Sequence, residues 1–430
     1  MKNFFKAKLL YCALLTFCFA MVTVCSGKVY ASGFALYEWS ARGNALGGTL
    51  VARADDPSAV AYNPAGITQL NGTQTLAGFT TLTLTNSLIT NYGGDEKNES
   101  LKEQYYLAPH AYLTHQINDN AWFGLGLYSK YGLGTKYSET WRGRYSSYDT
   151  SIETYSVNPN LAYKFNKYFS AAIGMELMYV KADLRCKRDP TGVNNPDSSG
   201  ATDIDQRIRV DGITPGFNAA LRVTPNDQWA IGFVYRSQMN HHAKGDVTYD
   251  SPAGISSPLY FNDTNVTMAM STPNTYSIGV AYKPFENFSI EGDAIFSQWS
   301  SFKNLSYRFE SATAIGRKEA DVAKKWSDVW RFQLGVEYSP VEDLDLRVGY
   351  VYDQSPIRDG YEDYMMPTND RQIISTGVGL HFGETVLDLS YSYLWMKDRK
   401  IEARAGSGVL DTTSTNNQSH MFAASLKCTF

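Results

Sequence analysis

The sequence contains little charge, little cysteine and almost no long apolar run. Only 19% of its 430 residues are charged, and 5 are cysteine. A polytopic helical membrane protein would need repeated apolar runs of about 20 residues, so that class is excluded. Aromatic residues are plentiful, at 14%, which argues against intrinsic disorder. The mean hydropathy of −0.32 is nevertheless that of a water-soluble protein.

The one apolar run, residues 9–24, lies at the N-terminus. Lys2, Lys6 and Lys8 precede it, and Val29-Tyr30-Ala31 follows it with residues that suit cleavage before Ser32. This order of basic, apolar and cleavage regions predicts a secretory signal peptide over residues 1–31. A retained membrane anchor is the alternative, for which the run is short.

Removal of this segment changes the charge and the cysteine content. Residues 1–31 hold four lysines and no acidic residue, so the rest of the chain has 35 basic and 43 acidic residues. This net acidity argues against nucleic acid as a partner. Only Cys186 and Cys428 remain, which excludes a secreted fold held together by several disulfides.

Beyond residue 72, apolar and polar residues alternate over long stretches. In 387–395 one face consists of Leu387, Leu389, Tyr391, Tyr393 and Trp395, and the other of Asp388, Ser390 and Ser392. The same alternation runs through 229–235, 276–282, 332–338, 344–353 and 419–430. Alternation of this length predicts strands with one apolar and one polar face.

Short turns and longer segments connect these strands alternately. Six short polar turns, such as Asn166-Lys167, alternate with seven long connections, such as 183–205 and 240–263. The count predicts about 14 antiparallel strands, and the asymmetry is typical of a transmembrane β-barrel with tight periplasmic turns and long outer loops. The predicted fold class is therefore all-β, with the barrel over 73–430.

A soluble β-sandwich is the alternative fold. It does not account for apolar strand faces that begin and end in Tyr, Trp or Phe, as the aromatic girdles of a barrel do. The terminal Phe430, with apolar residues at alternate positions before it, is the signature by which barrel proteins are delivered to the outer membrane. Phe430 therefore predicts recognition by the barrel assembly machinery.

Residues 32–72 lack this alternation. They are rich in glycine and alanine, Asp55-Asp56-Pro57 predicts a helix start, and Asn63-Pro64-Ala65-Gly66 predicts a turn. Because the segment precedes the first strand, it begins on the periplasmic side. It either hangs there or folds into the lumen, where a barrel of about 14 strands has room for it. The residues alone leave both arrangements open.

Short motifs occur in a definite order along the chain. They are GFALYEWSARGNALGG at 33–48, NPAG at 63–66, GLGLYSKYGLGTKY at 124–137, WRGRY at 141–145, NPNLAYKFN at 158–166, GFVYRSQMNHHAKGD at 232–246, SIGVAYKPFENFSIEGDAIFSQWSSFKNL at 277–305 and LRVGYVYDQSPIRDGYEDYMMPTNDR at 346–371. In this order they resemble the FadL-type outer-membrane transporters of long-chain fatty acids and aromatic hydrocarbons. The resemblance covers essentially the whole chain after the signal segment.

The resemblance implies a barrel of 14 strands closed by an N-terminal hatch, which assigns residues 32–72 to that hatch. It also implies an apolar pocket above the hatch, a rearrangement of the hatch, and a sideways exit at a kink in the third strand. Transport of this kind is diffusion down a gradient. No cofactor and no metal is therefore expected.

Glycines are the candidates for the kink. Gly124, Gly126, Gly132 and Gly134 interrupt the apolar run of the third expected strand, and glycine in a strand often marks a bulge or bend. The alternative is that these glycines make room for the hatch. The residues Asn63, Pro64, Ala65 and Gly66 are, in the same way, either the hinge of the hatch or an ordinary turn.

A fatty-acid carboxylate would need a basic residue near the pocket for a charge-assisted hydrogen bond. The resemblance indicates Lys181, in MYVKADL at the outer end of the fifth strand, because family members place a basic residue there near the ligand head group. Lys325 and Arg331, which flank WSDVW, are further candidates. Each could instead pair with a carboxylate of the hatch or wall. Asp55 and Asp56 could likewise pair with lumenal arginines and fix the hatch.

Two outer loops lie where the family builds an apolar groove. The loop at 183–205 is strongly polar and departs from that pattern, whereas 240–263 keeps Leu259, Tyr260 and Phe261.

Together these features predict a passive channel for hydrophobic compounds in the bacterial outer membrane, with long-chain fatty acids as the expected substrate. Aromatic hydrocarbons are the alternative, and a general porin is a further one that has no use for a 40-residue plug. An enzyme is not expected, because HExxH, GxSxG and paired CxxC motifs are absent. The expected partners are a hydrophobic small molecule, outer-membrane lipids and lipopolysaccharide, and the expected state is a monomer.

Overall fold

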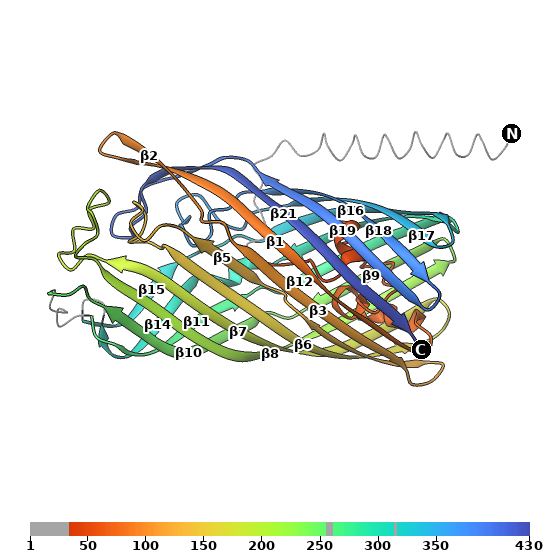
Figure 1. The fold of residues 1–430 in the computed structure, drawn as a ribbon. Coiled ribbons are helices and arrows are strands. Elements are labelled where there is room, and N and C mark those ends of the chain that lie inside the picture. Colours follow the sequence, from red (N-terminus) through yellow and green to blue (C-terminus); the bar gives the residue numbers. More distant parts are fainter. Residues whose placement is uncertain (1–33, 255–260, 314–315) are drawn as a thin grey trace.

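Twenty-one strand segments form one antiparallel sheet that closes on itself (Figure 1). The computed structural model describes residues 34–254, 261–313 and 316–430, so the signal peptide expected over 1–31 lies outside the described residues. The last segment, β21 (Asp411–Thr429), pairs with the first, β1 (Thr73–Tyr92), from Gln74↔Thr429 to Asn91↔Asp411. This pairing closes the sheet between its first and last strands, as a membrane-spanning sheet requires.

Fourteen strands cross the barrel wall, and five of them consist of two segments in line. In chain order they are β1, β3 (Tyr105–Gln116), β4 (Ala121–Tyr128) with β5 (Gly132–Lys136), β6 (Asp149–Lys164), β7 (Phe169–Arg188), β8 (Ile204–Asn226), β9 (Trp229–Arg236) with β10 (Met239–Asp250), β11 (Thr264–Thr272) with β12 (Thr275–Phe285), β13 (Phe288–Ser297) with β14 (Asn304–Thr313), β15 (Arg317–Ala323) with β16 (Val329–Val341), β17 (Leu344–Asp353), β18 (Arg371–Phe382), β19 (Thr385–Met396) and β21. The short β2 (Asp95–Ser100) and β20 (Arg399–Ile401) pair with β1 and β21. The prediction of about 14 antiparallel strands is confirmed.

On part of the barrel wall, polar side chains face the lumen and apolar side chains face outward. On β19, Asp388, Ser390 and Ser392 are buried, whereas Leu389 on the opposite face is 40% exposed. A soluble sandwich buries its apolar face and exposes its polar one. The arrangement here is the reverse, which fits a sheet surrounded by lipid.

Aromatic side chains form two belts on the outer face. In one belt the ring centroids of Tyr235 and Tyr276 lie 5.2 Å apart, and in the other those of Trp229 and Tyr282 lie 4.4 Å apart. The belts are six residues apart on β9 and on β12, which at about 3.3 Å per residue is roughly 20 Å along a strand. Tyr and Trp at two such levels are typical of the two membrane interfaces.

The two ends of the barrel differ. Tight turns lie at the end where the C-terminus is found, and long loops extend from the other, outer end (Figure 1). The outer loops have an apolar cluster of their own, in which the rings of Tyr137 and Trp141 stack at 4.3 Å. None of the helices in the described residues is long and apolar enough to cross a membrane.

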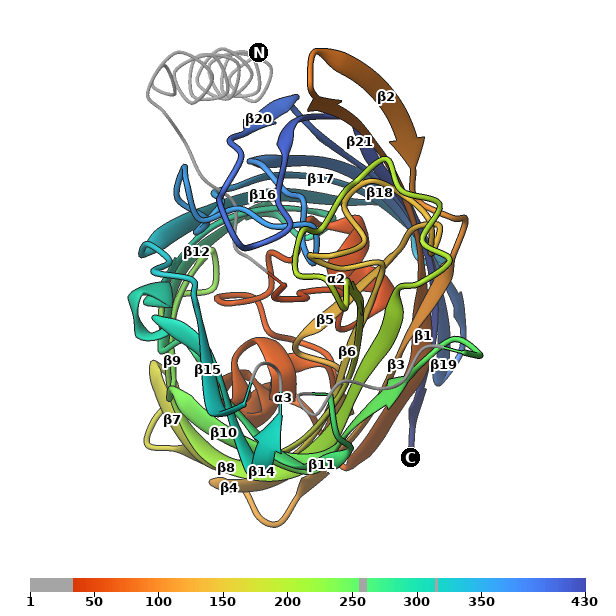
Figure 2. The ribbon, with the colours of Figure 1, turned by 90° about the vertical axis from the view of Figure 1, so that its left-hand side faces the viewer.

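The N-terminal segment lies inside the barrel (Figure 2). It contains α2 (Ala41–Ala45), α3 (Ala59–Tyr62) and the 3-10 helix η1 (Pro64–Gln69), all of them short. The segment contacts β17, β18 and β19 through α2, and β6, β7 and β8 through η1. It therefore crosses the lumen from one side of the wall to the other. Of the two arrangements that the sequence leaves open, the structure has the lumenal one.

Wall glycines let this segment approach backbone to backbone. A Cβ atom on Gly349 of β17 would lie 2.2 Å from the backbone nitrogen of Gly47, and one on Gly335 of β16 would lie 2.5 Å from the carbonyl oxygen of Leu46. Gly335 and Gly349 are direct neighbours in the sheet. Residues with side chains at these two positions would hold α2 away from the wall.

We expect Gly349→Ala to dislodge the N-terminal segment without preventing barrel assembly. The added methyl group meets backbone, and overpacking of this kind costs about 1–3 kcal/mol. Trypsin should then cleave at Arg42 or Arg53 in the folded, SDS-resistant barrel. Gly292→Ala is the matched control, because the nearest atom to its Cβ would be a carbonyl oxygen at 3.8 Å. Equal protection of Gly349→Ala and wild type would contradict this account of the docking.

Candidate functional site

A cavity of about 490 Å³ lies between the N-terminal segment and the outer part of the barrel. Its lining is largely apolar and includes Phe34, Leu36, Met366, Ile373, Leu394 and Met421. Arg331, Arg371 and Glu38 add charge at its wall. The cavity can therefore hold an apolar molecule with one polar end.

Phe34 occupies an aromatic box at one end of this cavity. Its ring centroid lies 5.5 Å from that of Tyr131, 5.1 Å from Trp299 and 5.8 Å from Trp326, each in an edge-to-face arrangement. The indole nitrogens of Trp299 and Trp326 are buried and have no hydrogen-bond partner within the described residues. The box is thus lined by aromatic faces and by two free N–H donors.

The third barrel strand is interrupted beside this box. β4 ends at Tyr128 and β5 begins at Gly132. The N-terminal segment satisfies the backbone there, because Leu36 N donates to Lys130 O at 2.9 Å and Gly132 N donates to Phe34 O at 3.0 Å. The strand that was expected to carry a kink is interrupted here, and the N-terminal segment forms part of the local hydrogen bonding.

The interruption leaves a gap in the wall. β3 pairs with β4 only from His110↔Tyr128 onward, and β5 pairs with β6 from Gly132↔Glu153 to Lys136↔Asp149. Among the described residues, no strand pairs with 105–109 on the side away from β1. Proline is tolerated at a sheet edge because it has no N–H to offer, and Pro109 lies at this one.

The cavity continues through the gap to the outer face of the barrel. Its lining includes Leu107 of β3 and Tyr155 of β6, which are 62% and 43% exposed on the outer face. It also includes Gly132 and Gly134 of β5, which lie between them. The lining of the cavity therefore extends from the lumen to residues that are exposed on the outer face.

The four candidate kink glycines fall into two pairs. A Cβ on Gly124 would lie 2.8 Å from Val60, and one on Gly126 would lie 3.0 Å from the same side chain. These two glycines precede the interruption and make room for the N-terminal segment, which is the alternative that the sequence left open. Gly132 and Gly134 follow the interruption and border the gap, and a Cβ on Gly132 would also lie 3.0 Å from Leu36 of the N-terminal segment.

Arg331 lies at the cavity. Its side chain is 4% exposed, Nη1 donates to Asp353 at 3.1 Å, and the guanidinium carbon lies 4.3 Å from the ring centroid of Tyr37. Nε is buried and has no hydrogen-bond partner among the described residues. One donor of a buried guanidinium is thus left for a ligand.

The structure places Lys181 and Lys325 away from the cavity. Lys181 is exposed on the outer face of β7, between Glu153 and Asp211 of the neighbouring strands. Lys325 is also exposed, with its ammonium nitrogen 5.2 Å from the ring centroid of Tyr361. Neither residue lines the lumenal cavity.

Two basic residues that sequence reasoning missed lie inside the barrel. Lys324, the neighbour of Lys325, is buried, pairs with Asp363, and lines a small void beside Phe34 and Trp326. Arg371 lines the main cavity. Strand alternation could not have found Lys324, because residues 324–328 lie between β15 and β16 and belong to neither strand.

Asn63 fixes the turn at 63–66. Its side-chain oxygen accepts a hydrogen bond from Ala65 N at 3.0 Å, and its Nδ2 donates to Val51 O at 2.6 Å and to Leu221 O of β8 at 3.1 Å. The turn separates α3 from η1 and ties the segment to the wall.

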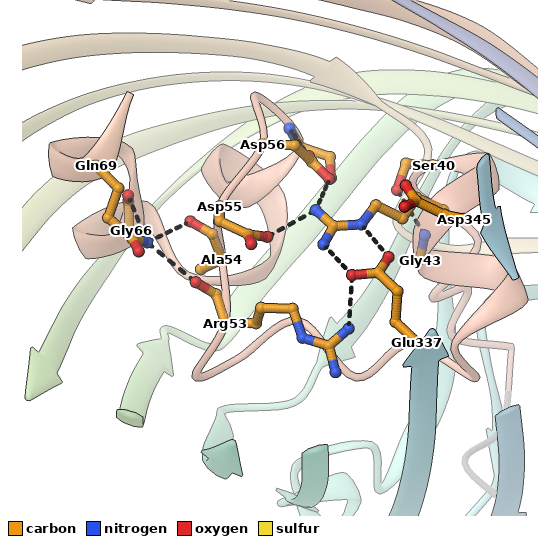
Figure 3. A network of polar contacts seen from close by, with 12 residues as sticks. Ser40, Gly43, Arg53, Ala54, Asp55, Asp56, Gly66, Gln69, Glu337 and Asp345 are labelled. Carbon is orange, nitrogen blue, oxygen red and sulfur yellow. Dashed lines mark hydrogen bonds and ion pairs between the residues drawn. The ribbon is translucent and has the colours of Figure 1, made fainter. Parts of the chain in front are cut away.

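Arg42 joins the N-terminal segment to the wall. Its three carboxylate partners, Asp55, Asp56 and Glu337, are labelled in Figure 3. Its Nη1 donates to Asp55 at 2.6 Å and to Asp56 at 3.0 Å, and its Nη2 donates to Glu337 of β16 at 2.9 Å. Arg347 of β17 donates to the same Glu337 at 2.6 Å. Asp55 and Asp56 therefore bind an arginine of their own segment, and the wall contributes the carboxylate that holds this arginine.

The loop over 354–370 covers the cavity with Met366, Pro367 and Thr368. Its last residue, Asp370, accepts hydrogen bonds from Tyr352 Oη and Ser355 N, both at 3.1 Å. Burial raises the pKa of Asp370 to about 7, although the Tyr352 hydrogen bond acts in the opposite direction. Phe261 contacts Tyr249 in another outer loop, with ring centroids 5.4 Å apart; Leu259 and Tyr260 lie outside the described residues.

A closed barrel with an apolar outer face, two aromatic belts and a lumenal cavity defines an outer-membrane transport protein. A model of the outer membrane protein transport protein family (OMPP1/FadL/TodX) matches residues 22–430. The chain belongs to this family, whose members are transporters rather than enzymes.

Individual relatives are distant but similar in length. A long-chain fatty acid transport protein of Escherichia coli O6:H1 is 24% identical over 425 residues, which cover 90% of this chain and 92% of that protein. A putative outer membrane protein of Neisseria meningitidis serogroup B is 24% identical over 421 residues, with coverage of 89% and 90%.

Solved structures share the fold. A Pseudomonas aeruginosa FadL homologue has a TM-score of 0.81 at 20% identity, over 92% of this chain and 99% of that one. The Pseudomonas putida toluene transporter TodX has a TM-score of 0.68 at 18% identity, over 94% and 100%.

Asp370 gives the loop over the cavity a pH dependence. Its pKa of about 7 lies above the value of about 3.9 for an unfolded aspartate, so the folded loop favours the protonated form. Its stabilising contribution is complete below about pH 4 and is lost as the pH rises through about 7. Hydrogen exchange of residues 354–370, corrected for intrinsic rates, should therefore be faster at pH 8 than at pH 5. Asp370→Asn should abolish this difference, and an unchanged difference would contradict the assignment.

Proposed function

We propose that this protein is a passive channel for hydrophobic compounds, that long-chain fatty acids are its substrates, and that they leave sideways through the gap beside the third strand. The observation that carries the proposal is the continuity of the cavity from the lumen, at Phe34, to the outer face, at Leu107 and Tyr155. A hydrophobic compound can follow this path into the membrane without entering water.

In this proposal the N-terminal segment, residues 32–72, is a hatch and residues 73–430 form the channel wall. Below the segment lies a second cavity, of about 740 Å³, lined by polar and charged residues such as Arg53, Arg222, Lys283 and Glu337. An apolar compound that entered it would exchange apolar contacts for water, which costs about 25 cal/mol for each Å² of apolar surface exposed. The polar floor thus favours the side exit over a passage to the periplasm.

Substrate binding displaces Phe34 from its aromatic box in this mechanism. Phe34, with its neighbours Ala35 and Leu36, also pairs with the backbone of the interrupted strand. Movement of Phe34 therefore alters the edge of the gap. The turn at Asn63, Pro64, Ala65 and Gly66, fixed to the wall through Asn63, is the pivot about which the hatch rearranges.

Arg331 is the residue that favours a fatty acid over an aromatic hydrocarbon. Its unpaired Nε is a donor for a carboxylate, and relatives of this chain are named long-chain fatty acid transport proteins. The aromatic box around Phe34 supports the alternative, an aromatic hydrocarbon channel, as in the toluene transporter TodX. A general porin is disfavoured by the segment that crosses its lumen.

The substrate assignment can be tested in a strain that lacks its own transporter, with labelled oleate and toluene. Arg331→Gln should lower oleate uptake roughly tenfold, which corresponds to the loss of one charge-assisted hydrogen bond of about 1.5 kcal/mol, and should leave toluene uptake unchanged. Arg331→Lys, which keeps the charge, is the control and should lose less. Uptake of toluene but not oleate by the unmodified protein would replace fatty acids with aromatic hydrocarbons as the substrate.

The side exit can be tested by closing the gap. In a Cys186→Ser, Cys428→Ser background, Gly132→Cys and Ala108→Cys joined by a short bifunctional maleimide should abolish uptake, because both residues line the path. The same reagent on His242→Cys and Ala269→Cys, which are paired neighbours in β10 and β11, should have no effect. Normal uptake after complete cross-linking of residues 108 and 132 would rule out this exit.

A further inference from the structure

The gap between β3 and β5 has definite upper and lower limits. At its outer end Lys102 N donates to Lys136 O at 2.8 Å, and toward the periplasm β3 rejoins the third strand at His110↔Tyr128. Within these limits, contact between the two strands is made by side chains. The side chain that crosses from β3 to β5 therefore decides how much of the gap is open.

Tyr106 is such a side chain. It lies between Tyr105 and Leu107, which are 73% and 62% exposed, so by alternation its own side chain points inward. Its ring lies against Gly134 of β5, where an added Cβ would be 2.1 Å from the ring atom Cε1 and 2.2 Å from the hydroxyl oxygen. Only a residue without a side chain at position 134 can accept the ring.

The orientation of Gly134 shows how the strands are arranged. Gly134 is paired with Ser151 of β6. Ser151 lies on the same face of β6 as Glu153, whose side chain is exposed on the outside. A Cβ atom on Gly134 would therefore point outward. The ring of Tyr106 points inward from β3 and occupies the place of that atom. The edge of β3 consequently overlaps β5 on the outside, and the ring of Tyr106 fills the seam between them.

The ring is held only weakly to the far side of the seam. The Tyr106 hydroxyl donates to the side chain of Gln104, two residues earlier in the chain. This hydrogen bond does not connect β3 to β5, and the contact with Gly134 is a van der Waals contact. The ring narrows the gap without locking it, since Gly134 has no side chain that could bond to it.

We propose that Tyr106 sets the width of the side opening and thereby the cross-section of the compounds that leave through it. The proposal rests on the side exit described above and goes beyond it by naming the residue that limits substrate size. With the ring in the seam, straight alkyl chains and single aromatic rings pass along the part of the gap lined by Gly132, Leu107 and Tyr155. Branched or polycyclic groups require the space that the ring occupies.

The test uses carboxylic acids of equal length that end in a linear alkyl, a phenyl or a pyrenyl group. Their initial uptake rates are measured in a strain that lacks its own transporter. Tyr106→Ala should raise the pyrenyl-to-linear ratio at least fivefold and leave linear uptake within twofold of wild type. Tyr105→Ala is the matched control, because this neighbouring ring is exposed on the outer face and does not fill the seam.

Two further variants test the contact between Tyr106 and Gly134 separately. Tyr106→Phe keeps the ring and loses the hydrogen bond to Gln104, so its ratio should equal that of wild type. Gly134→Ala forces the ring out of its place and should shift the ratio in the same direction as Tyr106→Ala. If Tyr106→Ala fails to give a heat-modifiable barrel, Gly134→Ala tests the same prediction with Tyr106 still in the chain.

An unchanged ratio in the folded variants would overturn the assignment of Tyr106. If the link between residues 108 and 132 still blocked uptake, the side exit would stand and only the size limit would be wrong. If that link left uptake normal, the side exit itself would fail, and the assignment of Tyr106 with it.

Discussion

Hydrocarbon offers no partner to a backbone N–H or C=O group, so a membrane-spanning sheet has to provide every hydrogen bond from within the protein. The closed sheet does so through the pairing of β1 with β21 and of each strand with the next. The third strand is the exception, because its ladder stops after Tyr128. There Phe34 and Leu36 provide two of the missing hydrogen bonds. An N-terminal segment that looks like a separate plug is thus also a piece of the wall.

The same segment divides the lumen into two chemically different halves. Above it lies the apolar cavity with Phe34 at its end, and below it lies a polar vestibule. Its attachment matches this division, because the charged contacts of Arg42 are made with Glu337 and the apolar contacts of Phe34 with Trp299 and Trp326. Wall glycines such as Gly349 let the backbone between these two sets of contacts lie directly on the sheet.

The barrel could be predicted from sequence because its causes are local. Alternation in stretches such as 387–395 and the contrast of short and long connections led to the right number of strands. Whether a residue belongs to the site depends on which face of its strand it occupies, and a shift of one residue along the strand reverses that face. Lys181 has the expected height on its strand but shares the outer face of Tyr179, whereas Arg331 shares the inner face of Gln333.

Other features of the site depend on contacts between residues far apart in the chain. Nothing near Gly124 and Gly134 in the sequence reveals that one packs against Val60 and the other against Tyr106. The gap itself exists because β3 and β5 fail to pair, which is a relation between two strands and not a property of either. Sequence reasoning located the glycines and could not divide them into their two roles.

The contacts of α2 have a consequence for the order of assembly. This helix is made of some of the first residues of the chain, yet it rests on β17, β18 and β19, and Arg42 meets a carboxylate 295 positions later. Contacts of such large sequence separation form late, since most of the chain has to be ordered first. Residues synthesised well before β17, β18 and β19 are therefore among the last to find their native neighbours, and the lumen is filled only after these strands are in place.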